Sequence, residues 1–176
     1  MSRHTQHSSF REKLVEHLFV GELLKLSWQT VECGLEVAKP EVDNSGYDLI
    51  AEANGVVRHI QLKSTYHGGK AATQKVHLRL SGKPSGCLVW IYVNEDTLEL
   101  GPFLYFGGKP GEPLPSLEGS RTARHTKGDQ DGHKAERPNL KVLNKGQFRS
   151  YKSVGEIYQA LFGAPAHNHS LQARRP

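Results

Sequence analysis

The amino-acid sequence predicts an α/β protein, in which a first helix is followed by a mixed central sheet and a short C-terminal helix. Three observations lead to this prediction. Apolar residues recur with helical spacing over residues 10–28, an Asn-Gly pair at 54–55 separates two largely apolar runs, and residues 88–93 (LVWIYV) are continuously apolar. The chain has 176 residues, which is close to the size of one ordinary domain.

The N-terminal half is expected to contain one helix and three strands. The helix covers residue 10 to about residue 28, where apolar side chains follow a 3.6-residue period. Residues 30–37 (TVECGLEV) alternate strictly between apolar and polar or small residues, which is typical of a half-exposed strand. Asn54-Gly55 predicts a two-residue hairpin turn, and Ala53 then pairs with Val56.

The rest of the chain is expected to add further strands and one helix. Residues 75–80 (KVHLRL) alternate like a strand, 88–93 suit a strand buried on both faces, and 97–106 suit one or two short strands. Residues 107–138, rich in Gly, Pro and charge, are interpreted as a surface excursion without a core of its own. Ser153 and Glu156 resemble a capping box before a helix over Val154 to Phe162. The expected organisation is a tail (1–9), a core (10–106), a basic surface excursion (107–152), a closing helix (153–163) and a second tail (164–176).

Cysteine usage and hydropathy favour a soluble, cytoplasmic protein with no membrane partner. Cys33 and Cys87 lie 54 positions apart without a CxxC pair, which argues against a disulfide scaffold. No apolar stretch approaches the roughly 20 residues that cross a bilayer, and the polar start MSRHTQHSS lacks a signal-peptide core.

Basic residues are concentrated in one segment. The formal net charge is +5, yet residues 121–152 alone hold nine Lys and Arg against three acidic residues. Such a segment suits contact with a phosphate backbone, so we expect a nucleic-acid partner; a merely solvated polar loop is the alternative. The candidate contacts are Arg121, Arg124, Lys127, Lys134, Arg137, Lys141, Lys145 and Arg149.

The predicted hairpin gathers polar groups on one face. Its register places Asp48 opposite Gln61, and Lys63 projects from the same side two residues further on. Arg58 is the only charged residue of the opposite row. That row is expected to face the core and contains Tyr47, Leu49, Ala51, Ala53, Val56, Ile60 and Leu62.

The first helix adds a carboxylate. On a helical wheel Glu22 falls within the apolar stripe formed with Leu14, Leu18 and Phe19. A core-facing carboxylate needs a compensating partner. That partner is either a metal ion or, in the ordinary alternative, Lys25.

These groups together suit one kind of chemistry. Carboxylate oxygens bind Mg²⁺ or Mn²⁺, and an ammonium can orient water or neutralise charge on a phosphate, so we expect metal-assisted phosphodiester hydrolysis. Ser64 and Thr65 follow the lysine and either touch phosphate or satisfy backbone groups.

Three short motifs resemble the PD-(D/E)XK nuclease superfamily, which contains many restriction enzymes. They are Gly21-Glu22, Gly46-Tyr47-Asp48-Leu49-Ile50 and Ile60-Gln61-Leu62-Lys63-Ser64, and the resemblance spans about residues 12–94. It implies a restriction-endonuclease-like core with a helix, a three-stranded meander, a crossover helix and a fourth strand. It also implies a Mg²⁺- or Mn²⁺-dependent endonuclease acting on DNA, with a homodimer as a plausible assembly.

The resemblance also implies roles for single residues. Glu22 would be the helix carboxylate, Asp48 the main metal ligand and Lys63 the catalytic lysine. Gln61 would replace the usual second acid, and the main-chain carbonyl of Leu62 would also bind metal. Because Gln61 is neutral, we expect weaker metal affinity than in a site with three acids.

Two other functions are compatible with the same residues. One is a nuclease-fold module that binds nucleic acid or a protein without hydrolysing anything. The other is a small interaction protein whose polar hairpin face is merely solvated. Salt-dependent DNA binding without metal uptake favours the first, and absence of both favours the second.

Overall fold

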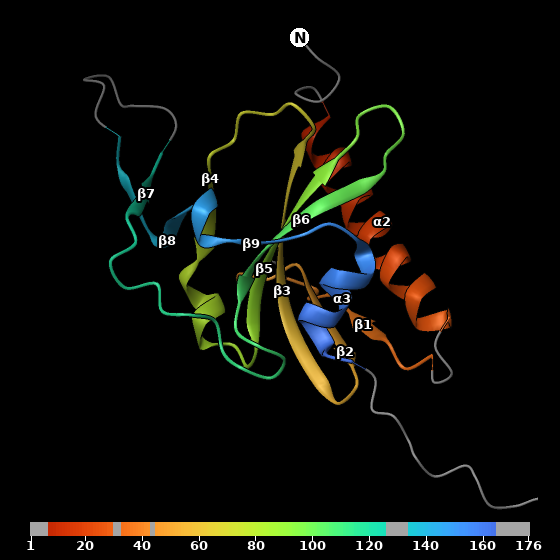
Figure 1. Ribbon diagram of the computed structural model, residues 1–176. Coiled ribbons are helices and arrows are strands. Elements are labelled where there is room, and N and C mark those ends of the chain that lie inside the picture. The colour runs from red at the N-terminus through yellow and green to blue at the C-terminus, as the bar shows by residue number, and fades with distance from the viewer. Residues whose placement is uncertain (1–6, 30–32, 43–44, 126–133, 165–176) are drawn as a thin grey trace, which may run out of the picture.

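The computed structural model of the protein describes residues 7–29, 33–42, 45–125 and 134–164, and it is a mixed α/β fold (Figure 1). A long helix and a six-stranded sheet dominate it. No helix among these residues is long and apolar enough to cross a membrane. The elements of this layer are α2 (Ser8–Gln29), β1 (Glu36–Ala38), β2 (Leu49–Ala53), β3 (Val56–Tyr66), β5 (Gly86–Val93), β6 (Leu100–Gly107), β9 (Arg149–Tyr151) and α3 (Val154–Phe162).

The main sheet has the order β1-β2-β3-β5-β6-β9. Strands β3 and β5 are parallel, and the other neighbouring pairs are antiparallel. A second sheet has the order β4-β8-β7. Its elements, with two short 3₁₀ helices, are β4 (Thr73–His77), η1 (Leu78–Gly82), β7 (Thr122–Arg124), β8 (Glu136–Asn144) and η2 (Lys145–Gln147).

The predicted hairpin is confirmed in its register. Ala53 pairs with Val56 and Leu49 pairs with Ile60, as a two-residue turn at Asn54-Gly55 requires. Asn54 and Gly55 both have positive φ, at 52° and 73°, as in a type I′ turn. The side chains of the expected core row are all buried or half-buried, but that of Tyr47 packs against the core on the other side of the sheet.

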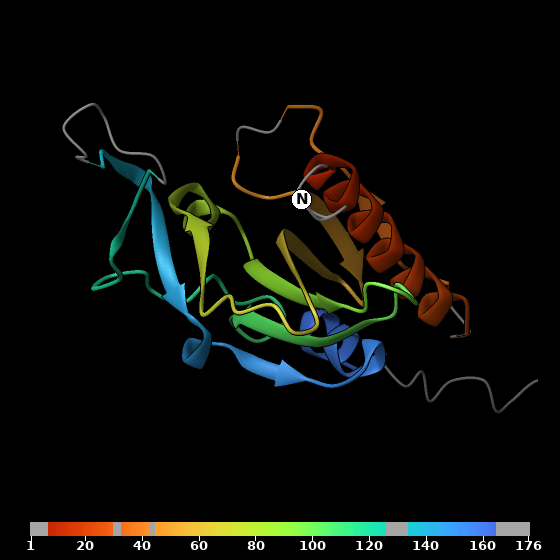
Figure 2. The same cartoon turned by 90° about the horizontal axis from the view of Figure 1, so that it is seen from above.

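Both faces of the main sheet are covered, so the sheet lies between two hydrophobic cores. Val89 and Ile91 of β5 join the core beneath α2 and α3, whereas Leu88 and Trp90 join the core beneath the second sheet. All eight residues of β5 are buried, which confirms the strand predicted from its continuous apolar run. Figure 2 shows α2 on one side of the main sheet and β8 on the other.

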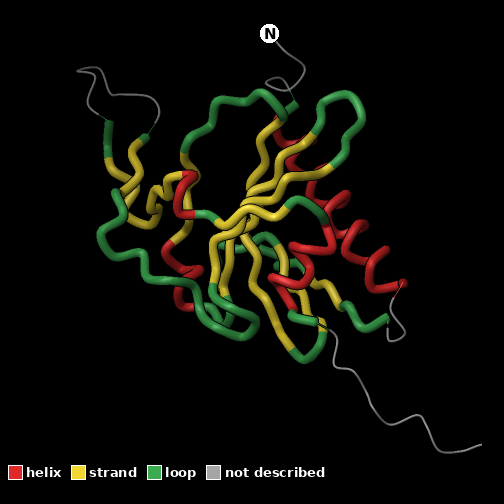
Figure 3. The backbone as a smooth tube through the Cα atoms, viewed as in Figure 1, coloured by secondary structure: helices red, strands yellow, loops and turns green. Residues whose placement is uncertain are grey.

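Three predicted elements between α2 and β5 differ from the structure. The strand expected at 30–37 is limited to β1, with residues 30–32 outside the described part; Cys33 has a φ of 43°, which interrupts an extended chain. The alternation at 75–80 forms β4 only as far as His77 and then continues as η1. The implied crossover helix between β3 and β5 is wrong, because strand β4 and the short η1 make this connection (Figure 3).

The region expected to be a surface excursion instead builds part of the second core. Strands β7 and β8 lie within it, where β8 pairs with β4 on one edge and with β7 on the other. The core that contains Trp90 of the main sheet also contains the buried residues Leu114, Leu117, Leu143 and Phe148. The sequence did not predict this part of the core, because the apolar residues of the region are widely spaced among glycine, proline and charged residues and show no regular period.

Helix α2 presents a different face to the sheet than its wheel predicts. Phe10, Leu24 and Trp28 are 72%, 45% and 79% exposed, so apolar residues occur around the whole circumference of the helix. The wheel therefore could not identify the inner face. The buried residues are Val15, Glu16, Phe19, Leu23 and Ser27.

The closing helix α3 is confirmed, and Arg58 fixes its C-terminal end. Ser153 Oγ accepts a hydrogen bond from Glu156 N at 3.2 Å, as the capping box predicts. Arg58 is fully buried, and its guanidinium donates to the carbonyls of Leu161 at 2.7 Å and Ala160 at 3.3 Å. These carbonyls belong to the last turn, whose acceptors lack partners within a helix and whose dipole favours a cation.

We therefore expect Arg58→Met to lower the free energy of unfolding by about 3 kcal/mol, because buried carbonyls lose charged donors. Urea denaturation followed by circular dichroism would measure the shift in midpoint. Arg121→Met, at an exposed position, is the control and should change stability by less than about 0.5 kcal/mol. Equal midpoints for the two variants would contradict this role for Arg58.

Candidate active site

Strand β3 extends well beyond its hairpin partner. Strand β2 has five residues and β3 has eleven, so the last part of β3 pairs with β5 alone. Asp48 lies at the point where β2 begins, and its amide donates to the Ile60 carbonyl at 2.9 Å. Its Oδ2 then accepts from the Leu62 amide at 2.6 Å. The Asp48 carboxylate thus continues the hydrogen-bond ladder along β3 beyond the first residue of β2.

Gly46 determines how the chain enters β2. Its φ is 78°, a left-handed conformation that favours glycine. A Cβ atom at this position would lie 2.7 Å from the Cβ of His77 on β4. The close approach holds the second sheet against the turn that presents Asp48.

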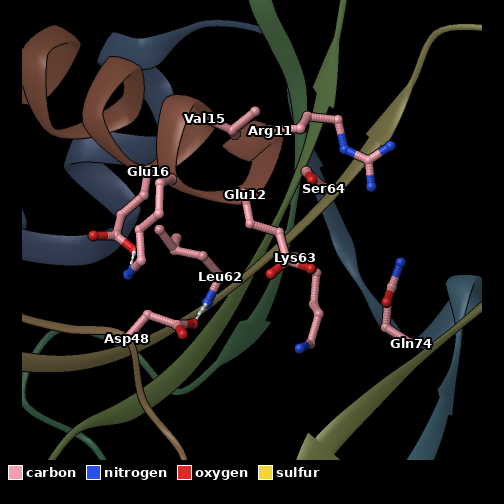
Figure 4. Close-up of a pocket in the computed structure, with 10 residues that line it drawn as sticks. Arg11, Glu12, Val15, Glu16, Asp48, Leu62, Lys63, Ser64 and Gln74 are labelled. Atoms are coloured by element: carbon pink, nitrogen blue, oxygen red, sulfur yellow. Dashed lines mark hydrogen bonds and ion pairs between the residues drawn. The ribbon is translucent and has the colours of Figure 1, made fainter. Parts of the chain in front are cut away.

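A pocket of about 440 Å³ opens beside the Asp48–Leu62 hydrogen bond (Figure 4). Four separate parts of the fold form it: the first turns of α2, the entry to β2 at Asp48, the edge of β3 beyond β2, and β4. Its lining residues are Arg11, Glu12, Lys13, Val15, Glu16, Asp48, Leu62, Lys63, Ser64 and Gln74. The pocket therefore contains two of the predicted site residues that carry charge, Asp48 and Lys63.

Lys63 and Leu62 present complementary groups to this pocket. Lys63 is half-buried, and Figure 4 shows its side chain extending between Asp48 and Gln74. In an extended strand the N–H and C=O of one residue point to the same edge. Because the Leu62 amide meets Asp48, the Leu62 carbonyl is directed to this edge as well.

The helix carboxylates of the pocket are Glu12 and Glu16. They are four residues apart and lie on the face of α2 that contains Phe19 and Leu23. Figure 4 shows the Glu12 carboxylate above Lys63, whereas that of Glu16 turns away from Lys63.

Glu16 is held by two lysines. Its side chain is 7% exposed, and its carboxylate lies 2.6 Å from Lys39 Nζ and 3.0 Å from Lys13 Nζ. Burial acts to raise the pKa of the Glu16 carboxyl, but the hydrogen bonds and charges of Lys39 and Lys13 outweigh burial. The net result is a pKa below the ordinary value of 4.5.

The structure does not bring Glu22 to Asp48. Glu22 lies farther along α2 beside a different cavity, which His67 and Lys152 also line. Its carboxylate pairs with Lys25 at 2.9 Å, which is the ordinary alternative considered from the sequence. The expected position of Glu22 in the site is therefore wrong. The face of α2 that packs on the sheet differs from the one predicted by the wheel, and it directs Glu12 and Glu16, not Glu22, to the pocket.

Gln61 is also directed elsewhere. It is buried, and its Oε1 accepts from the His77 amide at 3.3 Å, so that it joins β3 to β4. It is not among the residues that line the pocket. Gln61 thus supports the second sheet rather than contributing its amide oxygen beside Asp48.

Of the basic residues predicted to contact nucleic acid, Arg124, Arg137 and Lys141 lie on the second sheet. Arg121 and Lys134 lie just outside its strands β7 and β8, Lys145 lies in η2 and Arg149 lies on β9. Arg121, Lys134 and Arg137 are exposed, and Lys127 lies outside the described residues. The other four contact protein groups. Arg124 is 3.5 Å from Glu136, Lys141 donates to Thr122 Oγ1, Lys145 lies over the Tyr92 ring, and Arg149 donates to the Gly107 carbonyl.

Clusters of metal-ligating side chains and reactive thiols would each mark a site in the described part of the chain, the pocket included. No group of three or more His, Cys, Asp or Glu side chains there is arranged to hold a metal ion. Burial raises the pKa of the Cys87 thiol to about 12, so it is not a thiolate nucleophile near neutral pH.

No protein-family model matches this chain. No curated protein matches it either. The geometry of the pocket is therefore the basis for assigning a function.

Glu16 gives the first test of this geometry. Its lowered pKa stabilises the folded protein above the unfolded carboxyl's pKa, near 4.5, and this stabilisation is lost as the pH falls through the lower folded pKa. We expect Glu16→Gln to cost about 1 kcal/mol at neutral pH and progressively less as the pH falls below 4.5. Urea unfolding over this pH series measures the change in cost. Glu118→Gln, at an exposed position, is the control and should cost less than about 0.5 kcal/mol, whereas a cost of Glu16→Gln that does not change over the series would refute the ion pairs.

Proposed function

We propose that this chain is a metal-dependent nuclease that hydrolyses phosphodiester bonds in DNA. The observation that carries this proposal is the convergence of Glu12, Asp48 and Lys63 in one pocket, where β3 extends beyond β2. Two acids and an ammonium at an open pocket are the groups needed to hold a divalent ion and assist attack on a phosphate.

The arrangement of strands supports a restriction-endonuclease-like core. Strands β1, β2 and β3 form an antiparallel meander, and β5 lies parallel to β3. These four strands and α2 correspond to the order that the motif resemblance implies. Strand β4 and η1 occupy the connection where the resemblance implies a helix.

The donor set suits Mg²⁺ or Mn²⁺. Both prefer oxygen ligands, and Mg²⁺ is usually held by one or two carboxylates while retaining places for water and phosphate. We assign these ligands to Asp48, Glu12 and the carbonyl of Leu62. A bound ion would supply Lewis-acid stabilisation of charge on the phosphate oxygens.

The protein groups then have separate tasks. The Leu62 amide holds the Asp48 carboxylate in one orientation through their 2.6 Å hydrogen bond. Lys63 brings a positive charge to the phosphate that is attacked and donates a hydrogen bond to the attacking water. The exposed Arg121, Lys134 and Arg137, which lie on or next to strands β7 and β8, contact the DNA backbone and add salt-dependent affinity.

A second candidate function is DNA binding without hydrolysis. The observation that favours it is the charge balance of the pocket, because Lys13 and Lys39 neutralise Glu16 and leave Glu12 and Asp48 as its remaining acids. Such a pocket would take up divalent ions weakly. Isothermal calorimetry with Mn²⁺ separates the two functions, since metal uptake that disappears in Asp48→Asn supports the nuclease.

The nuclease proposal predicts that Lys63→Met lowers the rate of DNA cleavage by about 100-fold or more, because charge developing on the phosphate loses its nearest ammonium. Plasmid and branched DNA would be incubated with purified protein in Mg²⁺ or Mn²⁺ and the products resolved on gels. Lys109→Met, an exposed lysine outside the pocket, is the control. Cleavage by Lys63→Met at the wild-type rate would remove this residue from the mechanism.

Two glutamates of α2 provide a matched comparison. We expect Glu12→Gln to reduce cleavage by about 10-fold or more through loss of a metal ligand, whereas Glu22→Gln should retain wild-type activity because Glu22 pairs with Lys25 outside the pocket. The same gel assay across a Mn²⁺ titration measures both variants. The opposite ranking would assign the helix carboxylate to Glu22.

A further inference from the structure

The pocket is divided between acids and hydrogen-bond donors. Figure 4 shows Asp48 and Glu16 on one side of this view, and Arg11, Ser64 and Gln74 on the other. Lys63 lies between the two groups. The proposed nuclease site uses the acidic side and Lys63, and it leaves the donor side without a role.

Gln74 occupies an unusual position on β4. Two residues further on, Val76 is fully buried against the main sheet, and the partner of Gln74 on β8, Leu143, is fully buried too. Residues two apart on a strand share a face, so Gln74 belongs to an inward, otherwise apolar row. This row carries an amide at the place where it reaches the pocket.

Ser64 is a similar exception on β3. It shares a face with Ile60 and Leu62, and its partner on β5, Ile91, is fully buried. The next hydroxyl has a different task, because Thr65 Oγ1 accepts a hydrogen bond from Trp90 Nε1 at 2.9 Å. Of the two hydroxyls that follow Lys63, Ser64 is therefore the one in the pocket lining.

Arg11 brings a cation into the first turn of α2. This turn contains no acidic residue, although the helix dipole there favours a negative charge and disfavours a positive one. Arg11 is nevertheless half-buried and lines the pocket. An anion bound beside it would be stabilised both by the guanidinium and by the positive end of the helix.

We propose that Arg11, Ser64 and Gln74 form a subsite for a second phosphate of the nucleic-acid strand, next to the phosphate that is cleaved. A guanidinium, a hydroxyl and an amide all donate hydrogen bonds, and the three come from α2, β3 and β4. Phosphate oxygens accept such donors, and arginine provides a planar fork suited to two of them. This subsite deepens the proposed function, since it fixes the register of the strand relative to Lys63.

The test measures binding without cleavage. A fluorescein-labelled single strand of about 12 nucleotides is titrated with protein in EDTA, and anisotropy gives the affinity at several salt concentrations. For Arg11→Gln we expect about 10-fold weaker binding and a salt slope reduced by about 0.7, the value for one lost phosphate contact on a single strand. Arg11→Lys should restore the slope, and Gln74→Glu should weaken binding by placing a negative charge in the subsite.

Lys109→Gln is the control, because it removes one exposed charge outside the pocket. Thermal unfolding of each variant confirms that it is folded. If Arg11→Gln matches Lys109→Gln in affinity and slope, the subsite is refuted, whatever the cleavage assay gives. If Arg11→Gln loses affinity as expected but the wild type never cleaves DNA in Mg²⁺ or Mn²⁺, the subsite stands and the nuclease proposal fails.

Discussion

The hydrogen bond from the Leu62 amide to the Asp48 carboxylate is the interaction on which the candidate site depends. It forms because β3 is longer than β2, so that the backbone of β3 needs another acceptor where its partner ends. A side-chain carboxylate fills this place and is thereby fixed in orientation. The same strand edge carries Lys63 and Ser64, and α2 lies beside it. The pocket is thus a direct result of unequal strand lengths.

The two cores explain why this edge stays open. Helices α2 and α3 cover one face of the main sheet, and the second sheet covers the other, where Trp90 packs against Phe148. Gln61 and Gly46 both contact His77 of β4, so the second sheet is held close to the turn before Asp48. This attachment brings Gln74 to the pocket from a strand that belongs to a different sheet.

The hairpin was predictable because it depends on local chemistry. The inner face of α2 and the pairing of β4 with β8 were not, because they depend on contacts between residues distant in sequence. The Asn54-Gly55 turn sets the register from two residues alone, which is why the pairing of Leu49 with Ile60 and the placement of Asp48 beside β3 followed from the sequence. The helix carboxylate did not follow, because Phe10, Leu24 and Trp28 are apolar yet exposed and obscure the inner face of α2. Pairing of β4 with β8 joins Gln74 to Leu143, and a contact so distant in sequence leaves no periodic signal in either segment.

The charges of the pocket also constrain how a nuclease built on it would bind its ligands. Acids from α2 and from the start of β2 face Arg11, Lys13 and Lys63, so the pocket contains both signs of charge. Lys39 and Lys13 further compensate Glu16, which leaves Glu12 and Asp48 as the acids for a cation. A divalent ion therefore gains less attraction from the protein alone than it would in a site with three acids. An entering phosphate would supply the missing negative charge, so the ion and the DNA strand should bind cooperatively, each raising the affinity for the other.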